Sequence, residues 1–192
     1  MRAAASGLKR RMVDLYWNLR GPRLGFPSIP PTVRSVLFVC KGNICRSPFA
    51  EHVAQKLESD GHARGVIFAS AGLHVSKPKA PPSEAIRVAE KFGVDIEKHR
   101  SQVISRELME SFDLIVSMEV WQHAELNARF PQYRRKLFVL PLLEPDPIVK
   151  VGGYAAFNIE DPYGGSPAAF EQCFLRIERC VSGFLGSLAR PH

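Results

Sequence analysis

A short segment between Val36 and Pro48 joins the pattern of a buried strand to that of a helix start. Val36 to Val39 are apolar and rich in β-branched residues, which is typical of a buried strand. Ser47 is a residue type that caps helices, and Pro48 suits the first helical position, where its missing N–H costs nothing. A loop that joins a strand to a helix N-terminus points several backbone N–H groups at one spot. The segment therefore predicts a strand–loop–helix unit that binds an anion.

The loop inside this unit carries a nucleophile and a fixed positive charge. Cys40 ends the strand, and a thiol beside a helix N-terminus and Arg46 ionises readily. The planar guanidinium of Arg46 suits phosphate oxygens. Gly42 and Asn43 tolerate the tight or left-handed backbone of such a cradle, and Ser47 can donate its hydroxyl to the sulfur. A lone cysteine after a strand is more often a core residue, but these neighbours favour a thiolate that attacks phosphorus.

The run Val-Cys-x-Gly-Asn-Ile-Cys-Arg-Ser-Pro, which ends at Pro48, strongly resembles the loop of the low-molecular-weight protein tyrosine phosphatases. Their loop has the form Cys-x5-Arg-(Ser/Thr), and the longer version found here is highly specific. The resemblance implies that Cys40 and Arg46 are catalytic. It also implies a phosphate-binding loop made of Lys41, Gly42, Asn43, Ile44, Cys45, Arg46 and Ser47.

Strand and helix patterns alternate along the chain from Arg34 onward. Strands are predicted at 34–40, 66–70, 113–117 and 137–140. Helices are predicted at 48–60, 82–93, 120–130 and 167–189, with a short one near 105–110. Such alternation predicts an α/β fold in which helices cover both faces of a parallel sheet. The resemblance adds that the sheet has four strands. We therefore expect a three-layer α/β/α domain with the phosphatase loop between the first strand and the first core helix.

The sequence divides into a basic N-terminal extension at 1–33 and a phosphatase domain at 34–192. Within the extension, apolar residues recur at helical spacing over 8–19 among lysines and arginines, and prolines between Pro27 and Pro31 predict an extended link. A basic amphipathic helix can lie on an anionic membrane. The favoured interpretation is instead a helix packed on the domain or an arm.

The composition fits one enzyme domain and argues against several other classes. A chain of 192 residues is long enough for a single well-buried core. The formal net charge is +7, but no nucleic-acid-binding signature accompanies it, so the charge favours anionic substrates and no nucleic-acid partner is expected. No His/Cys/Asp cluster has metal-ligand spacing, so neither a metal nor a cofactor is expected. Four cysteines, without a signal peptide or a bilayer-spanning stretch, predict a reducing cytoplasm.

Asp161 is the predicted general acid, which is needed because the reaction expels an alkoxide or phenoxide. Taken alone, the segment from Asn158 to Gly165 is typical of a turn, with Asp-Pro and Gly-Gly pairs. The family carries its acid as Asp-Pro-Tyr/Phe shortly before the last helix, and Asp161-Pro162-Tyr163 matches that pattern. The resemblance implies that Asp161 protonates the leaving group and that Tyr163 lines the substrate cleft. Gly164 follows where many relatives have a second aromatic, as in bacterial members.

Four polar residues are implied by the resemblance to hold the loop from behind. They are Asn43, Ser47, Ser70 and His99. Ser70 ends the second predicted strand. Without the resemblance, His99 would be interpreted as an ordinary surface histidine.

Two other loop residues keep two interpretations each. Cys45 is a candidate redox partner that resolves an oxidised Cys40 as a disulfide, in line with the family, or it is a small packed residue. Lys41 either attracts acidic phosphopeptides at the entrance or faces solvent. Cys173 and Cys180 lie among apolar residues of the last predicted helix and are expected in the core.

These features together predict a protein tyrosine phosphatase that hydrolyses phosphotyrosine and small aryl phosphates through a phosphocysteine intermediate. An arsenate reductase on the same scaffold would need further redox cysteines after the third strand, and Ser117 to Trp121 contain none. A catalytically silent phosphotyrosine-binding module would keep Arg46 but lose Cys40 or Asp161. For a bacterial member, the resemblance suggests a tyrosine kinase or an export-linked protein as the phosphotyrosine substrate.

Overall fold

The computed structural model describes residues 29–30, 32–61, 65–143 and 154–188. The helix predicted over 8–19, and with it most of the 1–33 extension, lies outside these ranges. Where the description begins, the partly buried side chains of Ile29 and Val33 pack against the main hydrophobic core. The link that precedes the first strand is therefore in contact with the domain.

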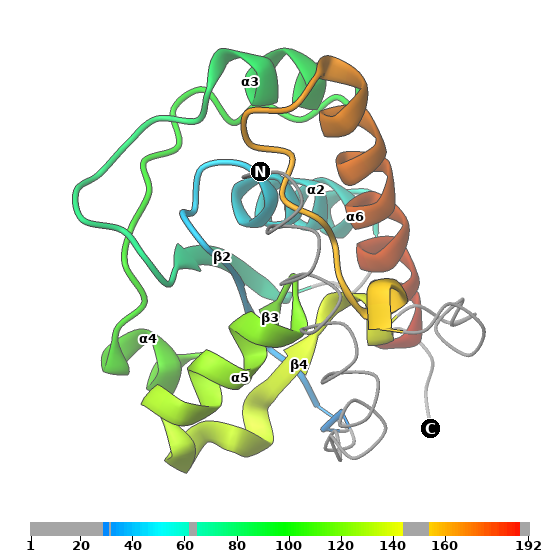
Figure 1. Ribbon diagram of the computed structural model, residues 1–192. Coiled ribbons are helices and arrows are strands. Elements are labelled where there is room, and N and C mark those ends of the chain that lie inside the picture. The colour runs from blue at the N-terminus through cyan, green and yellow to red at the C-terminus, as the bar shows by residue number, and fades with distance from the viewer. Residues whose placement is uncertain (1–28, 31, 62–64, 144–153, 189–192) are drawn as a thin grey trace.

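Four parallel strands form the sheet of the described residues (Figure 1). They are β1 (Ser35–Cys40), β2 (Ile67–Gly72), β3 (Leu114–Ser117) and β4 (Leu137–Val139), in the spatial order β2-β1-β3-β4. Cys40 pairs in register with Gly72, and Val39 pairs with Ser117. The carboxyl ends of β1, β2 and β3 therefore meet at one edge, and the expected four-stranded parallel sheet is confirmed.

Helices cover both faces of this sheet, and Figure 1 shows the two groups on opposite sides. One group is α2 (Arg46–Ser59), α3 (Ser83–Glu90) and α6 (Pro167–Leu188). The other is α4 (Arg106–Ser111), α5 (Val120–Arg129) and the 3-10 helix η2 (Pro131–Lys136). Two further 3-10 turns are η3 (Leu140–Leu143) and η5 (Tyr154–Phe157). The expected three-layer α/β/α arrangement is confirmed. Among the described helices, none combines the length and apolarity needed to cross a membrane.

The side chains of β1 alternate between the two hydrophobic clusters that join these layers. Val36 and Phe38 belong to the cluster with α2 and α6, whereas Leu37 and Val39 belong to the cluster with α4 and α5. All four side chains are completely buried. Because successive side chains of a strand point to opposite faces, only a central strand covered on both sides is buried throughout. The loop after Cys40 thus starts from the most constrained strand of the fold.

Helix α2 is fixed under the loop by aromatic stacking on α6. The rings of Phe49 and Phe174 lie 4.0 Å apart at 5° to one another, and Phe92 meets Phe49 edge-on at 5.3 Å. Fully buried aromatic pairs resist sliding, because each ring loses close contacts when the other shifts. The start of α2, which faces the site, is therefore rigidly placed against the C-terminal helix.

Several element boundaries differ from their predictions for local reasons. Helix α2 begins at Arg46 rather than at Pro48, because the last loop residues already have helical hydrogen bonding. Strand β2 extends to Gly72, which pairs with Cys40 and also forms a bridge with Val103. The helix predicted over 82–93 ends at Glu90, and the chain then turns through Gly93 at a φ of +67°.

Candidate active site

The thiol of Cys40 lies at the base of the loop and accepts two hydrogen bonds. The backbone N–H of Asn43 donates to the sulfur at 3.2 Å, and the hydroxyl of Ser47 donates at 3.1 Å. Cys40 is 3% exposed and sits at the carboxyl end of β1. Two donors aimed at a nearly buried sulfur stabilise its thiolate form. This is the state in which a cysteine attacks phosphorus.

The backbone of the loop turns at Asn43, whose φ of +52° makes it the single non-glycine residue with a left-handed backbone in the described ranges. The side chain of Asn43 donates from Nδ2 to the hydroxyls of Ser47 and Ser70 at 2.9 and 2.8 Å. Its Oδ1 accepts from the backbone N–H of Gln102 at 2.9 Å. Nε2 of His99 lies 3.0 Å from the Asn43 carbonyl. These bonds compensate the strained backbone and fix the curvature of the loop.

All four residues expected behind the loop are therefore brought together, and Gln102 is an additional member that sequence reasoning missed. Because the Asn43 carbonyl can only accept, Nε2 of His99 carries a proton. Burial lowers the pKa of His99 below its usual value, although its bond to the Asn43 backbone opposes that effect. A neutral imidazole with its proton on Nε2 suits this position.

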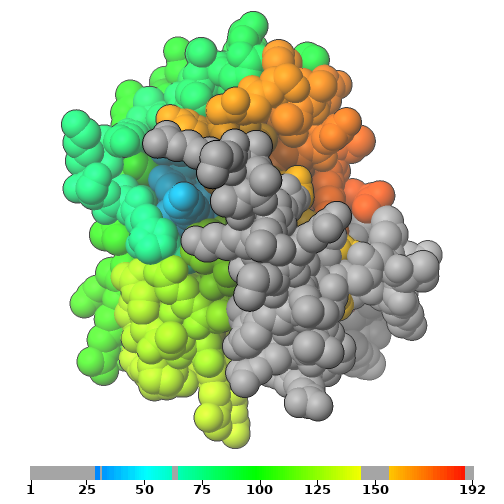
Figure 2. Space-filling model, in the orientation of Figure 1, coloured from blue at the N-terminus to red at the C-terminus, as the bar shows by residue number. Residues whose placement is uncertain are grey.

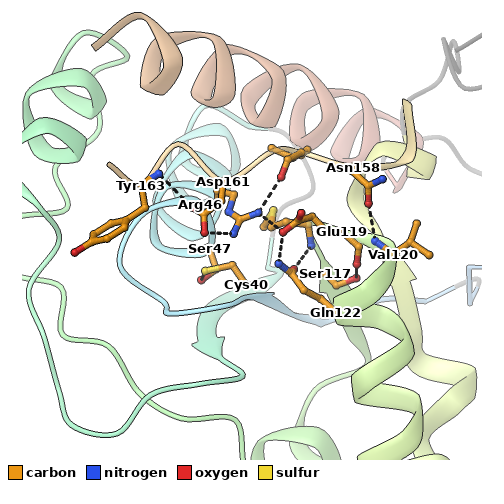
Figure 3. Close-up of polar contacts among 12 residues, drawn as sticks. Cys40, Arg46, Ser47, Ser117, Glu119, Val120, Gln122, Asn158, Asp161 and Tyr163 are labelled. Carbon is orange, nitrogen blue, oxygen red and sulfur yellow. Dashed lines mark hydrogen bonds and ion pairs between the residues drawn. The ribbon is translucent and has the colours of Figure 1, made fainter. Parts of the chain in front are cut away.

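Among the described residues, Arg46 is the largest fully buried side chain, and it contacts two carboxylates. Nη1 donates to Oε2 of Glu119 at 2.6 Å and to the carbonyl of Ile159 at 2.9 Å, and Nη2 lies 2.8 Å from Oδ2 of Asp161 (Figure 3). Burial opposes the charge of Arg46, but Cys40, Glu119 and Asp161 outweigh it and raise the pKa of the guanidinium above its usual value. Nε is buried without a hydrogen-bond partner. The side chain is thus a permanent cation whose Nε–H is unused.

Glu119 is a functional candidate that the sequence analysis did not single out. It follows β3 and precedes α5, and its Oε2 also accepts from Nε2 of Gln122 at 2.8 Å. Oε1 of Gln122 in turn accepts from the backbone N–H of Met118 at 3.0 Å. The segment in which an arsenate reductase would need redox cysteines therefore supplies a carboxylate that orients Arg46. An acidic residue two positions after a buried strand was the available signal, because β3 ends at the same edge as β1.

Asp161 reaches the site on a segment that is fastened to the β3–α5 connection. The backbone N–H of Ile159 donates to the Met118 carbonyl at 2.9 Å, and Oδ1 of Asn158 accepts from the Val120 N–H at 2.9 Å. Oδ1 of Asp161 accepts from the Tyr163 N–H at 3.3 Å. With 39% of its side chain exposed, Asp161 has one side on Arg46 and the other toward solvent. A carboxyl placed in this way can exchange protons with both substrate and water.

These groups surround one cavity of about 230 Å³ at the carboxyl edge of the sheet. In the space-filling view, the blue residues that follow β1 lie at the bottom of a hollow bordered by teal and orange segments (Figure 2). Its lining consists of Cys40, Lys41, Gly42, Ile44, Cys45, Arg46, His74, Lys79, Asp161 and Tyr163. His74 and Lys79 are exposed and were not predicted, and Lys79 adds positive charge beside Lys41. Tyr163, which is 64% exposed, forms an aromatic part of the entrance.

The remaining thiols near the site are buried and hard to ionise. Burial, together with the neighbouring Cys40 and Asp161, raises the pKa of Cys45 far above its usual value. Burial likewise raises the pKa of Cys173 to about 12, although Arg46 opposes this effect. All four cysteines are free thiols, and Cys173 and Cys180 lie in the core as expected. A disulfide between Cys40 and Cys45 stays a prediction.

A thiol at the end of a central strand, held above a helix start and beside a buried arginine, places this domain among the cysteine-dependent phosphatases. A sequence model of the family described as low molecular weight phosphotyrosine protein phosphatase matches residues 35–192. The chain belongs to this family.

Individual relatives agree with this assignment. The chain is 31% identical over 153 residues to the probable low molecular weight protein-tyrosine-phosphatase EpsP of Ralstonia solanacearum, a match that covers 80% of this chain and 94% of EpsP. The tyrosine phosphatase Wzb from Escherichia coli K30, solved in complex with sulphate, superimposes with a TM-score of 0.71 at 26% identity and covers 82% of this chain and 100% of Wzb. A mutant of the arginine phosphatase YwlE with a phosphorylated active-site serine also has a TM-score of 0.71 at 26% identity, covering 81% and 96% of the two chains.

Proposed function

We propose that this enzyme hydrolyses phosphotyrosine with Cys40 as nucleophile, Arg46 as phosphate-binding residue and Asp161 as general acid. The observation that carries the proposal is their convergence. The sulfur with its two donors, the buried guanidinium and the half-exposed carboxyl line a single cavity, and Arg46 lies 2.8 Å from Asp161. Wzb in complex with sulphate supports a site for tetrahedral anions in this fold.

In the first step, the Cys40 thiolate attacks phosphorus, and the bond between phosphorus and the tyrosine oxygen breaks. Arg46 and the loop N–H groups hold the non-bridging oxygens, which carry the charge in the transition state. Asp161 gives its proton to the departing oxygen, so that a phenol leaves rather than a phenoxide. The products of this step are tyrosine and a phosphocysteine.

In the second step, water attacks the phosphocysteine, and the sulfur–phosphorus bond breaks. Asp161 takes a proton from the water as it attacks, and Cys40 leaves as the thiolate that started the cycle. The two hydrogen bonds at 3.1 and 3.2 Å make the sulfur a better leaving group, because they hold the charge that returns to it. Phosphate then departs from Arg46.

Arg46 is shared between Asp161 and the substrate in this scheme. Before substrate binds, the guanidinium is paired with Asp161 and Glu119. An incoming phosphate dianion competes for Nη2 and can also accept from the unused Nε. Displacement from Arg46 frees the Asp161 carboxyl to move to the leaving oxygen. Glu119 is held by Gln122 and stays in place to orient the guanidinium.

The rim of the cavity points to a phosphoprotein with acidic residues around its phosphotyrosine. Lys41 and Lys79 flank the cavity, which matches one of the two interpretations given for Lys41, and Tyr163 offers a face on which the substrate ring can stack. A bacterial tyrosine kinase or an export-linked protein, as the family resemblance suggests, is the proposed partner.

The proposed cellular setting is a reducing cytoplasm, because Cys40 must stay a free thiol. We also propose that 34–192 is the phosphatase domain and 1–33 an extension to it. The contact of Ile29 and Val33 with the core supports a small shift of that boundary toward the N-terminus.

The test of the proposal is hydrolysis of para-nitrophenyl phosphate and of phosphotyrosine peptides by the wild type, Cys40→Ser and Asp161→Asn. We expect no turnover by Cys40→Ser. Asp161→Asn keeps the shape of the side chain, and we expect it to lose about 10²–10⁴-fold in kcat for phosphotyrosine. Its loss should be smaller for para-nitrophenyl phosphate, whose leaving group needs less protonation. Turnover by Cys40→Ser would overturn the nucleophile, and an equal loss on both substrates would overturn the general acid.

A phosphoarginine peptide belongs in the same assay, because one structural relative is an arginine phosphatase. Its leaving group is a guanidine nitrogen rather than a phenolic oxygen. Faster turnover of phosphoarginine than of phosphotyrosine would replace the proposed substrate while leaving the roles of Cys40 and Arg46 intact. Binding of phosphotyrosine without turnover would instead indicate a recognition module.

A further inference from the structure

A second cluster of chemically reactive side chains lies behind the phosphate-binding loop, outside the cavity. It consists of Glu51 and His52 on α2 and His99 in the segment between α3 and α4. One carboxylate oxygen of Glu51 and one ring nitrogen of each histidine all lie within 4.8 Å of one another. The two imidazole rings stand nearly perpendicular, at 86°, with centroids 6.4 Å apart. All three side chains are partly buried, so that they are oriented but reachable from solvent.

Two of the three side chains are already held by hydrogen bonds on the side that faces the loop. Nε2 of His99 donates to the Asn43 carbonyl at 3.0 Å, which leaves the lone pair on Nδ1. Oε2 of Glu51 accepts from the Ser70 hydroxyl at 2.7 Å. Histidines that bind metals typically donate their other ring N–H to a carbonyl or carboxylate, and metal-binding carboxylates are themselves hydrogen-bonded. This pattern is present here before any ion binds.

We propose that Glu51, His52 and His99 bind a divalent transition-metal ion such as Zn²⁺. Two imidazole nitrogens and one carboxylate oxygen are a donor set that suits Zn²⁺, Ni²⁺, Co²⁺ and Cu²⁺, whereas Mg²⁺ and Ca²⁺ prefer oxygen ligands alone. Three protein ligands leave the remaining coordination positions to water. The expectation from sequence spacing that no metal site exists is therefore replaced by a proposal, because His99 joins the cluster only through the fold.

The distances require a small adjustment of the side chains. Two atoms that are each about 2.1 Å from the same zinc ion are no more than about 4.2 Å apart. Rotation of the His52 side chain can close the difference. The hydrogen bonds that hold Glu51 and His99 in place do not involve the His52 ring. His52 is therefore the ligand that moves, and the other two form the fixed half of the site.

The ion at this site holds the loop from behind and takes no part in phosphoryl transfer. Through His99, the ion is connected to the carbonyl of Asn43, the residue at the left-handed turn of the loop. Through Glu51, it is connected to the Ser70 hydroxyl, which accepts a hydrogen bond from the Asn43 side chain. A metal ion that binds only the folded arrangement stabilises it by mass action. The metal site is separate from the reaction centre, since the hydrogen bonds to the Cys40 sulfur come from Asn43 and Ser47 and not from the three ligands.

The test uses the untagged full chain with Cys40→Ser, because the reactive thiol would itself attract Zn²⁺. Titration calorimetry and thermal unfolding with Zn²⁺ are compared with the same protein that also carries His52→Gln. We expect saturable 1:1 binding and a rise in Tm, and a loss of about tenfold or more in affinity from His52→Gln. The matched control is His74→Gln, an exposed histidine that pairs with Glu125 and should leave Zn²⁺ affinity unchanged. Mg²⁺ should give no shift.

Co²⁺ identifies the ligand atoms in the enzyme with its native Cys40. The expected absorption is that of nitrogen and oxygen ligands, without a thiolate-to-cobalt charge-transfer band. Equal Zn²⁺ affinity with and without His52→Gln, no binding at all, or a thiolate band that disappears with Cys40→Ser would each overturn the proposal. The last result would place the ion on the catalytic thiol instead.

Discussion

At the scale of single residues, the site is organised around one buried cation. Arg46 contacts Glu119 on one segment and Asp161 and the Ile159 carbonyl on another, about forty residues further along the chain. Removing one partner of a buried charge pair lowers the free energy of unfolding by more than the pair adds to it, because the remaining charge stays buried without compensation. The two carboxylates have different duties: Glu119 is enclosed and fixed, whereas Asp161 is more exposed and free to exchange protons.

Replacement of Glu119 tests its positioning role. In Glu119→Ala, the guanidinium loses an enclosed partner and can tilt, so we expect kcat/KM for a phosphotyrosine peptide to fall about 10- to 100-fold. We also expect a loss of about 1–3 kcal/mol in the free energy of unfolding by urea. Glu119→Gln keeps the shape and one hydrogen-bond acceptor, and should retain more of both. Wild-type values for Glu119→Ala would contradict the positioning role.

Thiol reactivity separates Cys40 from its buried neighbours. A pKa raised above its usual value means that Cys45 and Cys173 stay protonated through the neutral range and gain reactivity only when the pH approaches that raised value. We expect one equivalent of iodoacetate at pH 7 to modify Cys40 with loss of activity, as seen by mass spectrometry of peptides. Inorganic phosphate should protect Cys40. Labelling of Cys173 at the same rate as Cys40 would show that burial does not control these thiols. The same raised pKa makes Cys45 a slow partner for an oxidised Cys40.

The residues that sequence reasoning found and missed differ in how they are encoded. Cys40, Arg46 and Ser47 lie within eight residues of one loop, and Asp161 stands in the short Asp-Pro-Tyr pattern. Each of these residues is therefore recognisable from its neighbours in the sequence. For Glu119 the local pattern is only an acidic residue shortly after a buried strand, which does not by itself indicate a contact with Arg46. Its role depends on β3 lying beside β1, which follows from the strand order and not from any spacing in the chain.

At the scale of elements, the end of β2 is the template on which the loop rests. Gly72 pairs with Cys40, and a Cβ at this position would lie 2.7 Å from Val75 Cγ2 and 3.0 Å from both Cβ and N of Asn43. Real side-chain atoms are almost never that close. The absence of a side chain at Gly72 is therefore what lets the loop turn so close to the neighbouring strand.

Gly72→Ala should consequently displace the loop. We expect a loss of about 1–3 kcal/mol in the free energy of unfolding, together with a raised KM for phosphotyrosine peptides. The matched control is Gly186→Ala in α6, where a Cβ meets nothing within 4 Å and alanine favours the helix by up to about 1 kcal/mol. If Gly72→Ala were as stable and as active as Gly186→Ala, the loop would not depend on this contact.

The elements themselves were predicted well, and their ends less so. Buried strands such as β1 show as continuous apolar runs, and α6 shows a long apolar stripe, so their existence is a local property. The start of α2 at Arg46 depends on the backbone of the folded loop, and the extension of β2 to Gly72 depends on its pairing with Cys40 of β1. The 3-10 helix η2 was not predicted, because its Pro-Gln-Tyr-Arg-Arg-Lys sequence has no apolar period.

At the scale of the whole molecule, positive charge gathers where the substrate enters. The chain carries a formal net charge of +7, and Lys41 and Lys79 stand at the rim of the cavity. Opposite charges on enzyme and substrate raise the rate of encounter, and salt screens this effect over about 8 Å at physiological ionic strength. The rim should therefore act on association more than on the chemical step.

Kinetics at two salt concentrations test this role of the rim. For a phosphotyrosine peptide with flanking acidic residues, we expect kcat/KM to fall several-fold between low and high salt, and Lys79→Gln to lower both kcat/KM and its salt dependence while kcat stays the same. Arg134→Gln is the matched control, because η2 precedes β4 and so lies toward the opposite edge of the sheet. An equal effect of the two substitutions would assign the salt dependence to net charge alone.

The bonds of Asn43 also govern when during folding the enzyme becomes active. Its partners Ser70, His99 and Gln102 lie 27, 56 and 59 residues further along the chain. Contacts over such separations form late, since the chain must first close long loops. Although the seven loop residues are consecutive, the cradle cannot assemble until β2 and the segment at 99–102 have docked. A half-folded molecule can thus possess its helices and strands and still be inert toward phosphoproteins, so that activity appears only as the last step of maturation.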